Sequence, residues 1–321
     1  MPTPTMSVRA NLIAALVILG LTTPIVRWLI IHGGETGLIA PGVISYCNVL
    51  FVGNLAAALV SLLVFGPRAI LADLRGVRGV GWLHLAGHIA LAVIVPALLF
   101  TALEMTTAIN FILLARFEIV PVSIISFVIL RRQRTPASWC GLVLILIGAA
   151  LICTFDAIQR DLRGEVLIVI AVTIQGFSIL LADSNVSSVG VCGMLFVRNA
   201  VSSLVFFVTA MILFGPEHFA EAFTGRLWIV MVIYAAIIVV SGQLTMHRAK
   251  RTHDARALST WSLTVPAIAV IGAWAILQEQ PSLTQIIALV CIVSGLALGR
   301  PQRHESHRTV PIAERGLAAG N

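Results

Sequence analysis

The sequence predicts an all-α integral membrane protein with about ten transmembrane helices, and three observations support this fold class. Hydrophobic residues make up 59% of the 321 residues, whereas charged residues make up only 11%. Soluble globular chains contain about 25% charged residues, so a water-soluble fold could not bury this much apolar surface. Each crossing of a bilayer needs about 20 apolar residues, which leaves room for about ten crossings and short loops. We therefore expect no additional soluble domain.

Ten apolar segments, separated by turn or charged residues, define the predicted helices. They cover residues 10–32, 42–65, 80–103, 107–130, 137–155, 165–183, 191–214, 227–246, 256–277 and 283–299. Trp82, Trp139 and Trp228 lie at predicted helix starts, where an amphipathic ring suits the headgroup region. The first segment resembles a signal peptide, but it contains Arg27 and has no small-residue cleavage site. We therefore interpret it as the first transmembrane helix.

The basic residues predict how the chain is oriented, because Lys and Arg are enriched in cytoplasmic loops. With the N-terminus inside, the basic clusters at 68–78, 131–134, 248–256 and 300–315 all fall on the cytoplasmic side. Only Arg160, Arg163 and Arg226 then lie outside. We expect a multi-pass protein of the inner (plasma) membrane with both termini in the cytoplasm and a disordered tail over 301–321. These clusters also account for the net charge of +7, so the expected partner is the lipid bilayer and not nucleic acid.

The two halves of the chain resemble each other. The segment from Leu50 to Asn54 recurs from Leu195 to Asn199 at an offset of 145, and both helices run up to a Gly-Pro pair. Further matches at nearly the same offset pair Pro121 with Pro266, Thr135 with Ser282 and Gly148 with Gly295. The predicted repeats cover residues 1–156 (helices 1–5) and 164–300 (helices 6–10). Because each repeat has an odd number of helices, the second must enter the membrane from the opposite face, as two inverted five-helix repeats.

Several of these segments resemble a known family. The run from Ala108 to Pro121, followed by Arg131–Thr135, Trp139 and Leu142–Gly148, resembles the end of an EamA repeat. The second half carries the counterpart, from Ala255 through Pro266 and Glu279–Ser282 to Gly295. The chain is thus similar to EamA-type members of the drug/metabolite transporter superfamily up to about Gly299. Two positions depart from the pattern: Arg132 stands where such repeats usually carry an acidic residue, and Arg116 and Glu118 precede Pro121.

The resemblance implies a secondary, non-ATP transporter that works by alternating access. It implies export of a metabolite or amino-acid-like compound more often than import. It also implies that helices 1–4 and 6–9 surround the substrate cavity, while helices 5 and 10 brace it from outside. A membrane sensor or scaffold protein without transport activity stays open as the alternative.

Ionisable side chains at membrane depth cost about 2.5–3.5 kcal/mol each, so they are candidates for function. The sequence places Arg27, Arg116, Glu118, Asp183 and Arg198 within the predicted helices. Arg116 and Glu118 are two residues apart, about 200° around an α-helix, and cannot simply pair with each other. We expect Arg116 and Arg198 to line a central cavity and Glu118 to neutralise one of them or bind a coupling proton. The alternatives are a structural ion pair for these residues, snorkelling for Arg27 and an interfacial position for Asp183.

Polar and aromatic residues complete the predicted cavity. They are Asn54, Asn110, Gln175, Asn199 and Gln243, with Trp28 and Trp261 as aromatic walls. Hydrogen bonding between helices is the alternative for the amides. The prolines at 24, 96, 121 and 266 fall inside predicted helices, where each removes a backbone hydrogen bond and either hinges or simply kinks the helix.

The basic candidates outnumber the acidic ones, which favours a small-molecule substrate with an anionic group. No hydrolase, metalloprotease or Walker motif is present, so we expect neither an enzyme nor a cofactor. His84 and His88 share a helix face but have no further ligands nearby in the sequence, so no metal site is expected. Gly295 and Gly299 form a G-x-x-x-G pair, which either packs within the subunit or joins a homodimer.

Overall fold

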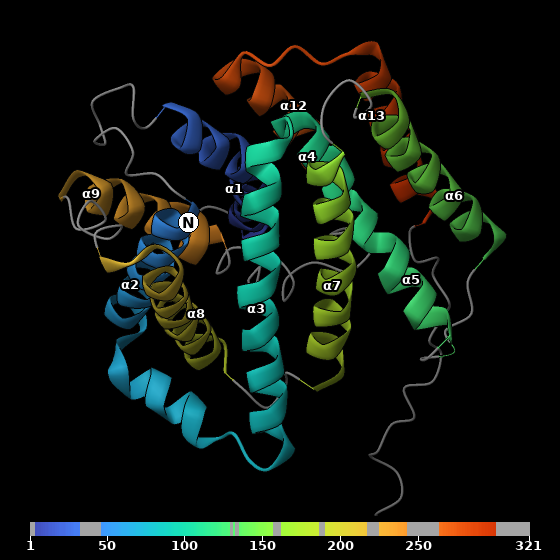
Figure 1. Cartoon of the computed structure of the whole chain (residues 1–321). Coiled ribbons are helices and arrows are strands. Elements are labelled where there is room, and N and C mark those ends of the chain that lie inside the picture. The colour runs from blue at the N-terminus through green and yellow to red at the C-terminus, as the bar shows by residue number, and fades with distance from the viewer. Residues whose placement is uncertain are drawn as a thin grey trace, which may run out of the picture.

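A computed structural model of the chain describes residues 4–32, 46–128, 131, 135–156, 162–185, 190–216, 225–242 and 263–299. Among these residues it is all-helical, without a β-strand, and each predicted segment contains at least one helix (Figure 1). The α-helices are α1 (Pro4–His32), α2 (Tyr46–Arg75), α3 (Val80–Met105), α4 (Ala108–Ala115), α5 (Ile119–Val128), α6 (Pro136–Leu151), α7 (Arg163–Asn185), α8 (Val191–Phe214), α9 (Gly225–Tyr234), α12 (Thr264–Leu277) and α13 (Leu283–Leu298). A 3-10 helix, η1 (Arg116–Glu118), and two π-helices, η2 (Ile152–Asp156) and η6 (Ala235–Ser241), adjoin them.

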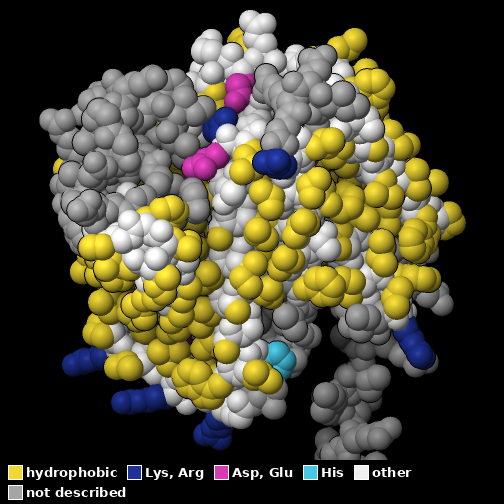
Figure 2. All heavy atoms as spheres, in the orientation of Figure 1, with side chains coloured by type: hydrophobic (Ala, Val, Ile, Leu, Met, Phe, Trp, Pro, Cys, Tyr) yellow, Lys and Arg dark blue, Asp and Glu magenta, His cyan; other side chains and the backbone are white. Residues whose placement is uncertain are grey.

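Length and composition agree with a multi-pass membrane protein. Five helices among the described residues are long and apolar enough to cross a bilayer, and four shorter apolar helices accompany them. Figure 2 shows a broad apolar surface between two ends that carry charged side chains, with Lys and Arg gathered at the lower end. Such a belt is what the hydrocarbon core of a membrane covers.

The segment predicted over 107–130 forms one apolar span, Ala108–Val128, with a short 3-10 turn inside it that the sequence did not indicate. It consists of α4, the short 3-10 helix η1 and α5. Pro121 lies in the first turn of α5, inside this span as predicted. A proline ring clashes with the carbonyl group four residues earlier, here that of Phe117, and the tighter 3-10 turn accommodates it. Arg116 and Glu118 therefore lie in a 3-10 turn within this span.

The helix predicted to end at Gly66-Pro67 does stop at Gly66, and a further helical stretch that the sequence did not predict follows it. Gly66 has φ 75° and ψ 155°, and α2 resumes from Pro67 to Arg75. Glycine adopts positive φ at little cost, and proline suits the first turn of a new helix. The matching pair in the second half behaves as predicted, because α8 ends at Phe214 and Gly215 has φ 79°. The prolines at 24 and 96 do lie inside α1 and α3, whereas Pro266 is in the first turn of α12.

Four helix pairs make the main contacts of the bundle: α2 with α8, α6 with α13, α3 with α7, and α1 with α12. In Figure 1, α3 and α7 run side by side through the middle, while α6 and α13 lie together at one edge. Each pair joins one predicted half of the chain to the other. The hydroxyl group of Ser203 on α8, for example, donates to the carbonyl oxygen of Phe51 on α2 at 3.2 Å.

The contact between α6 and α13 is reciprocal. A Cβ atom on Gly148 would lie 2.8 Å from Cγ1 of Ile292, and one on Gly295 would lie 2.8 Å from Cγ1 of Ile145. Gly148 and Gly295 are repeat-matched, and so are Ile145 and Ile292, at the same offset of 147. The two helices also start alike, because Thr135 caps α6 and Ser282 caps α13 through their side chains. Repeat-matched residues therefore have equivalent environments in these two helices.

Candidate functional site

A buried polar network joins α7 to the junction between α3 and α4. Glu165, in the first turn of α7, is only 2% exposed. Its Oε1 atom accepts hydrogen bonds from the hydroxyl group of Thr106 and, at 3.3 Å, from Nδ2 of Asn110. Asn110 in turn accepts from Nε2 of Gln285 on α13 at 2.7 Å. Oε2 of Glu165 is buried and has no hydrogen-bond partner among the described residues.

A second acidic side chain caps α4 from the other half of the chain. The backbone N–H groups of Ala108 and Ile109 each donate to one carboxyl oxygen of Glu279, both at 3.2 Å. The first N–H groups of a helix have no partner within it, and its N-terminus carries partial positive charge, so a carboxylate is favoured there. Thr107 adds a side-chain cap to the N–H of Asn110 at 3.2 Å. This gives Glu279, the acidic residue of the EamA-like pattern, a physical role.

The Glu279→Ala variant is expected to lower the free energy of unfolding by about 1–2 kcal/mol, because it removes two hydrogen bonds and a charge from the start of α4. The melting temperature of the purified protein measures the loss. Gln280→Ala is the matched control, since Gln280 is exposed in the same loop. Equal melting temperatures for the two variants would contradict this role of Glu279.

At the other end of the bundle, the carboxyl group of Asp73 accepts a hydrogen bond from the backbone N–H of Gly193 at 3.0 Å. Asp73 lies in the part of α2 that follows the Gly66 kink, and Gly193 lies in the first turn of α8. The continuation of α2 beyond Gly66 therefore has a consequence: it brings a carboxyl group to the start of a helix from the second half.

The predicted charged residues occupy separate places in the bundle. Arg116 and Glu118 lie in η1, which packs against α6 and α7. Arg198 lies on α8, close enough to His88 of α3 for its charge to act on that imidazole. Among the described residues, neither arginine forms a salt bridge and the Nε atom of Arg116 is buried without a hydrogen-bond partner. The ion pair between helices that the sequence left open is thus not observed in this part of the chain.

The amides behave in two different ways. Nδ2 of Asn54 donates to the carbonyl oxygen of Leu50 at 2.7 Å, and Nδ2 of Asn199 donates to that of Leu195 at 2.8 Å. These repeat-matched residues therefore each bond to their own helix, one turn back. Asn110 instead connects three helices through the network around Glu165. Gln175 is half-buried on α7, and Trp261 and Gln243 lie outside the described residues, as does the side chain of Asp183.

Sequence reasoning did not identify Glu165, Thr106 or Gln285 as candidates. Glu165 stands at the start of a predicted helix, where an acidic residue is expected simply to complement the helix N-terminus. The packing of α7 against α3 and α4 buries it. Among the described residues no group of three or more His, Cys, Asp or Glu side chains could hold a metal ion.

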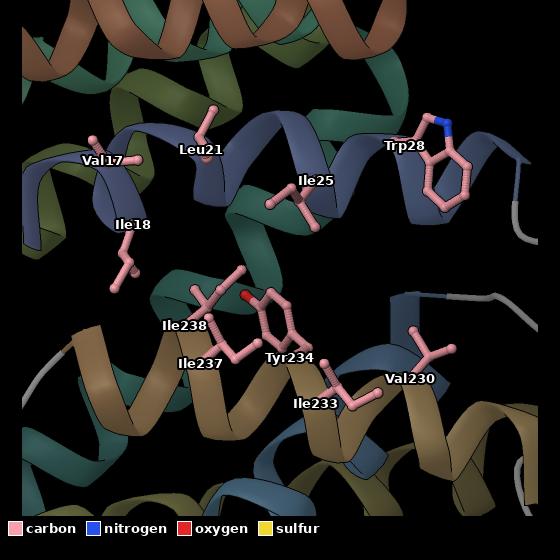
Figure 3. Close-up of a pocket in the computed structure, with 10 residues that line it drawn as sticks. All are labelled: Val17, Ile18, Leu21, Ile25, Trp28, Val230, Ile233, Tyr234, Ile237 and Ile238. Atoms are coloured by element: carbon pink, nitrogen blue, oxygen red, sulfur yellow. The ribbon is translucent and has the colours of Figure 1, made fainter. Parts of the chain in front are cut away.

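An apolar cavity of about 280 Å³ lies between α1 and the continuous pair α9/η6 (Figure 3). Trp28, predicted as an aromatic wall, lines it together with Tyr234. The other lining residues are aliphatic: Val17, Ile18, Leu21, Ile25, Val230, Ile233, Ile237 and Ile238. We call this cavity the α1/η6 slot.

Comparisons with known proteins agree with this architecture. Residues 162–299 match the EamA-like transporter family. A crystal structure that is 18% identical aligns with a TM-score of 0.55 over 92% of this chain and 97% of the other, which shows a common fold. The "uncharacterized transporter sll1164" of Synechocystis sp. is 31% identical over 294 residues, covering 88% of this chain and 84% of that protein. The chain therefore belongs to the EamA-like family of membrane transporters.

Proposed function

We propose that the protein is a secondary transporter that exports a small polar or anionic metabolite, or an amino-acid-like compound, by alternating access. The observation that carries the proposal is the set of cations kept inside an apolar bundle. Arg116 and Arg198 lie within helical segments of a membrane protein, and neither forms a salt bridge to another described residue. A charge retained at membrane depth is costly, and an anionic group on a transported molecule would supply the missing partner.

The proposal includes two inverted repeats, over residues 1–156 and 164–300, that rock against each other. Three observations support it. The α6/α13 contacts are reciprocal between residues 147 positions apart. Repeat-matched Thr135 and Ser282 cap equivalent helices. The family match covers residues 162–299, close to the range predicted for the second repeat. Carriers built from inverted repeats place their substrate between the copies.

The orientation follows from charge. Arg68, Arg75, Arg78 and Arg131 are exposed, and Lys and Arg gather at one end of the molecule in Figure 2. In membrane proteins, Lys and Arg are in excess on the cytoplasmic side. That end and both termini therefore face the cytoplasm, and the membrane is the plasma membrane. Glu118 is the proposed site for a coupling proton, because it is the carboxyl group nearest to Arg116 in the chain.

Reconstitution in liposomes tests the function. The wild-type protein should move labelled anionic or zwitterionic metabolites across the bilayer, and Arg116→Ala and Arg198→Ala should each reduce the flux by about 10- to 100-fold, the effect of losing a charge-assisted hydrogen bond. Arg68→Ala, which removes an exposed arginine, is the matched control. Glu118→Gln should reduce flux only when a pH gradient drives it.

Two results would overturn the proposal. Full flux in both Arg116→Ala and Arg198→Ala would remove these residues from the site. Absence of flux for every metabolite, with an altered response of a partner protein, would instead favour a sensor or scaffold.

A further inference from the structure

The chain between the Gly66 kink and the start of α3 is bounded by two glycines with positive φ. Gly66 has φ 75° and Gly79 has φ 51°, which glycine adopts at little cost. Among the described residues, a Cβ atom at either position would meet no neighbouring group within 4 Å, so the backbone can turn there without a clash. We call residues 67–78 the 67–78 strap. In Figure 1 it begins as the angled helix at the lower end that leads into α3.

One side chain of the strap is seated on the start of α8. The carboxyl group of Asp73 accepts a hydrogen bond from the backbone N–H of Gly193 at 3.0 Å. Two glycines make room for it: a Cβ atom on Gly190 would overlap the carboxyl group of Asp73, and one on Gly193 would lie 2.8 Å from Cβ of Asp73. The positive end of the helix dipole also favours a carboxylate at this place. The bare backbone at the start of α8 is thus a fitted seat for Asp73.

This contact joins the two predicted halves at the end that is proposed to face the cytoplasm. The strap belongs to the first half and α8 to the second. Arg198 lies seven residues after Val191, the first residue of α8, which is about 10 Å along the helix axis. When two halves of a carrier rock against each other, contacts between them must break at the end that opens. The bond from Gly193 to Asp73 therefore has to break before Arg198 is reached from this side.

Little else holds the strap in place. Of its residues only Ile70 and Val77 are buried, and segments with few buried apolar contacts open at low free energy. The opposite end of the bundle is bonded more heavily, because Glu165 and Glu279 together accept four hydrogen bonds from the first half. Among the described residues, the contact of Asp73 is thus the one between the halves that opens most easily.

We propose that the 67–78 strap is a cytoplasmic latch. It is closed while the carboxyl group of Asp73 is seated on Gly193, and it swings away about Gly66 and Gly79 when access from the cytoplasm opens. This inference rests on the proposed function. Two glycine hinges, one fitted seat and a shallow attachment are the parts that such a latch needs, and a hinge of this kind absorbs its motion in a few residues at the ends of elements.

Double electron–electron resonance on the full-length protein in liposomes measures the movement of the strap. The native cysteines are replaced by serine, and spin labels are attached to Leu71→Cys in the strap and Leu204→Cys on α8, at positions that are 49% and 60% exposed. The matched control pair keeps the label on α8 and uses Leu63→Cys, which is 84% exposed on α2 before Gly66. The strap pair should give two distances, whereas the control pair should give one.

The Asp73→Ala substitution, added to both pairs, tests the seat. It should raise the ratio of the longer to the shorter strap distance by about 10-fold, the effect of losing one charge-assisted hydrogen bond, and leave the control pair unchanged. Asp73→Asn should shift the ratio in the same direction by less, which keeps the test informative if Asp73→Ala folds poorly. Arg75→Ala is the matched control variant, since Arg75 is exposed on the same strap, and it should keep the wild-type ratio.

The outcomes separate the latch from the function. A single strap distance that Asp73→Ala does not alter, or equal shifts in Asp73→Ala and Arg75→Ala, would overturn the latch, and wild-type flux of labelled metabolites would then still support transport. A strap distance that shifts only in the Asp73 variants, without flux of any labelled metabolite by the wild type, would support the moving strap and overturn transport.

Discussion

The Glu165→Ala variant is expected to lower the free energy of unfolding by about 3 kcal/mol or more. The substitution leaves the hydroxyl group of Thr106 and the Nδ2 group of Asn110 without their acceptor in a buried environment. Each unsatisfied buried group costs about 1–3 kcal/mol. The lost side chain also leaves a cavity, because Glu165 is only 2% exposed.

Melting temperatures of purified variants in one detergent measure this effect. Glu165→Gln is the matched variant, since it keeps an oxygen atom that can accept from Thr106 and Asn110, and it should lose much less stability than Glu165→Ala. A double-mutant cycle with Asn110→Ala should show coupling of about 0.5–3 kcal/mol, because the two residues share one network. A melting temperature for Glu165→Ala equal to that of the wild type would show that the network contributes nothing to stability.

Hydropathy was sufficient to predict the helices because the cost of exposing polar backbone in lipid forces whole segments to be apolar. All ten predicted segments contain helix. The helical stretch after Gly66 and the 3-10 turn before Pro121 were not predicted, because a local choice there decides between ending, kinking and tightening a helix. A Gly-Pro pair permits both an end and a restart, and the sequence around it gives no preference. Packing against other helices decides whether a helix restarts, as the hydrogen bond from the N–H of Gly193 to the carboxyl group of Asp73 illustrates.

The candidate site was less predictable than the fold. Charged residues inside a predicted helix could be identified from the sequence, which is how Arg116 and Arg198 were found, and both are half-buried. Glu165 could not, because its burial depends on a neighbour 59 residues earlier in the chain, Thr106. The α1/η6 slot was missed for a related reason. Its lining residues are apolar, as are most residues of a transmembrane helix, so no sequence pattern distinguishes a side chain that faces a cavity from one that faces lipid.

The Gly295→Ala variant is expected to destabilise the protein by about 2–3 kcal/mol, the upper part of the range for overpacking. A Cβ atom on Gly295 would lie 2.5 Å from the carbonyl oxygen of Gly141 on α6, and the same clash arises from Gly141 toward Gly295. Backbone atoms cannot move aside as a flexible side chain can, so α6 and α13 would have to separate. The G-x-x-x-G pair of the sequence thus packs within the subunit at its first glycine.

The second glycine of the pair supplies the control. A Cβ atom on Gly299 would come no closer than 3.3 Å to its nearest neighbour, so Gly299→Ala should change stability by less than about 1 kcal/mol. Melting temperature and oligomeric state, measured on both variants, separate the two uses of the motif. If the glycines joined a homodimer, both substitutions would dissociate it while the monomer kept its stability. Because the close contact is between α6 and α13 of one chain, we expect Gly295→Ala to lower the melting temperature at an unchanged oligomeric state.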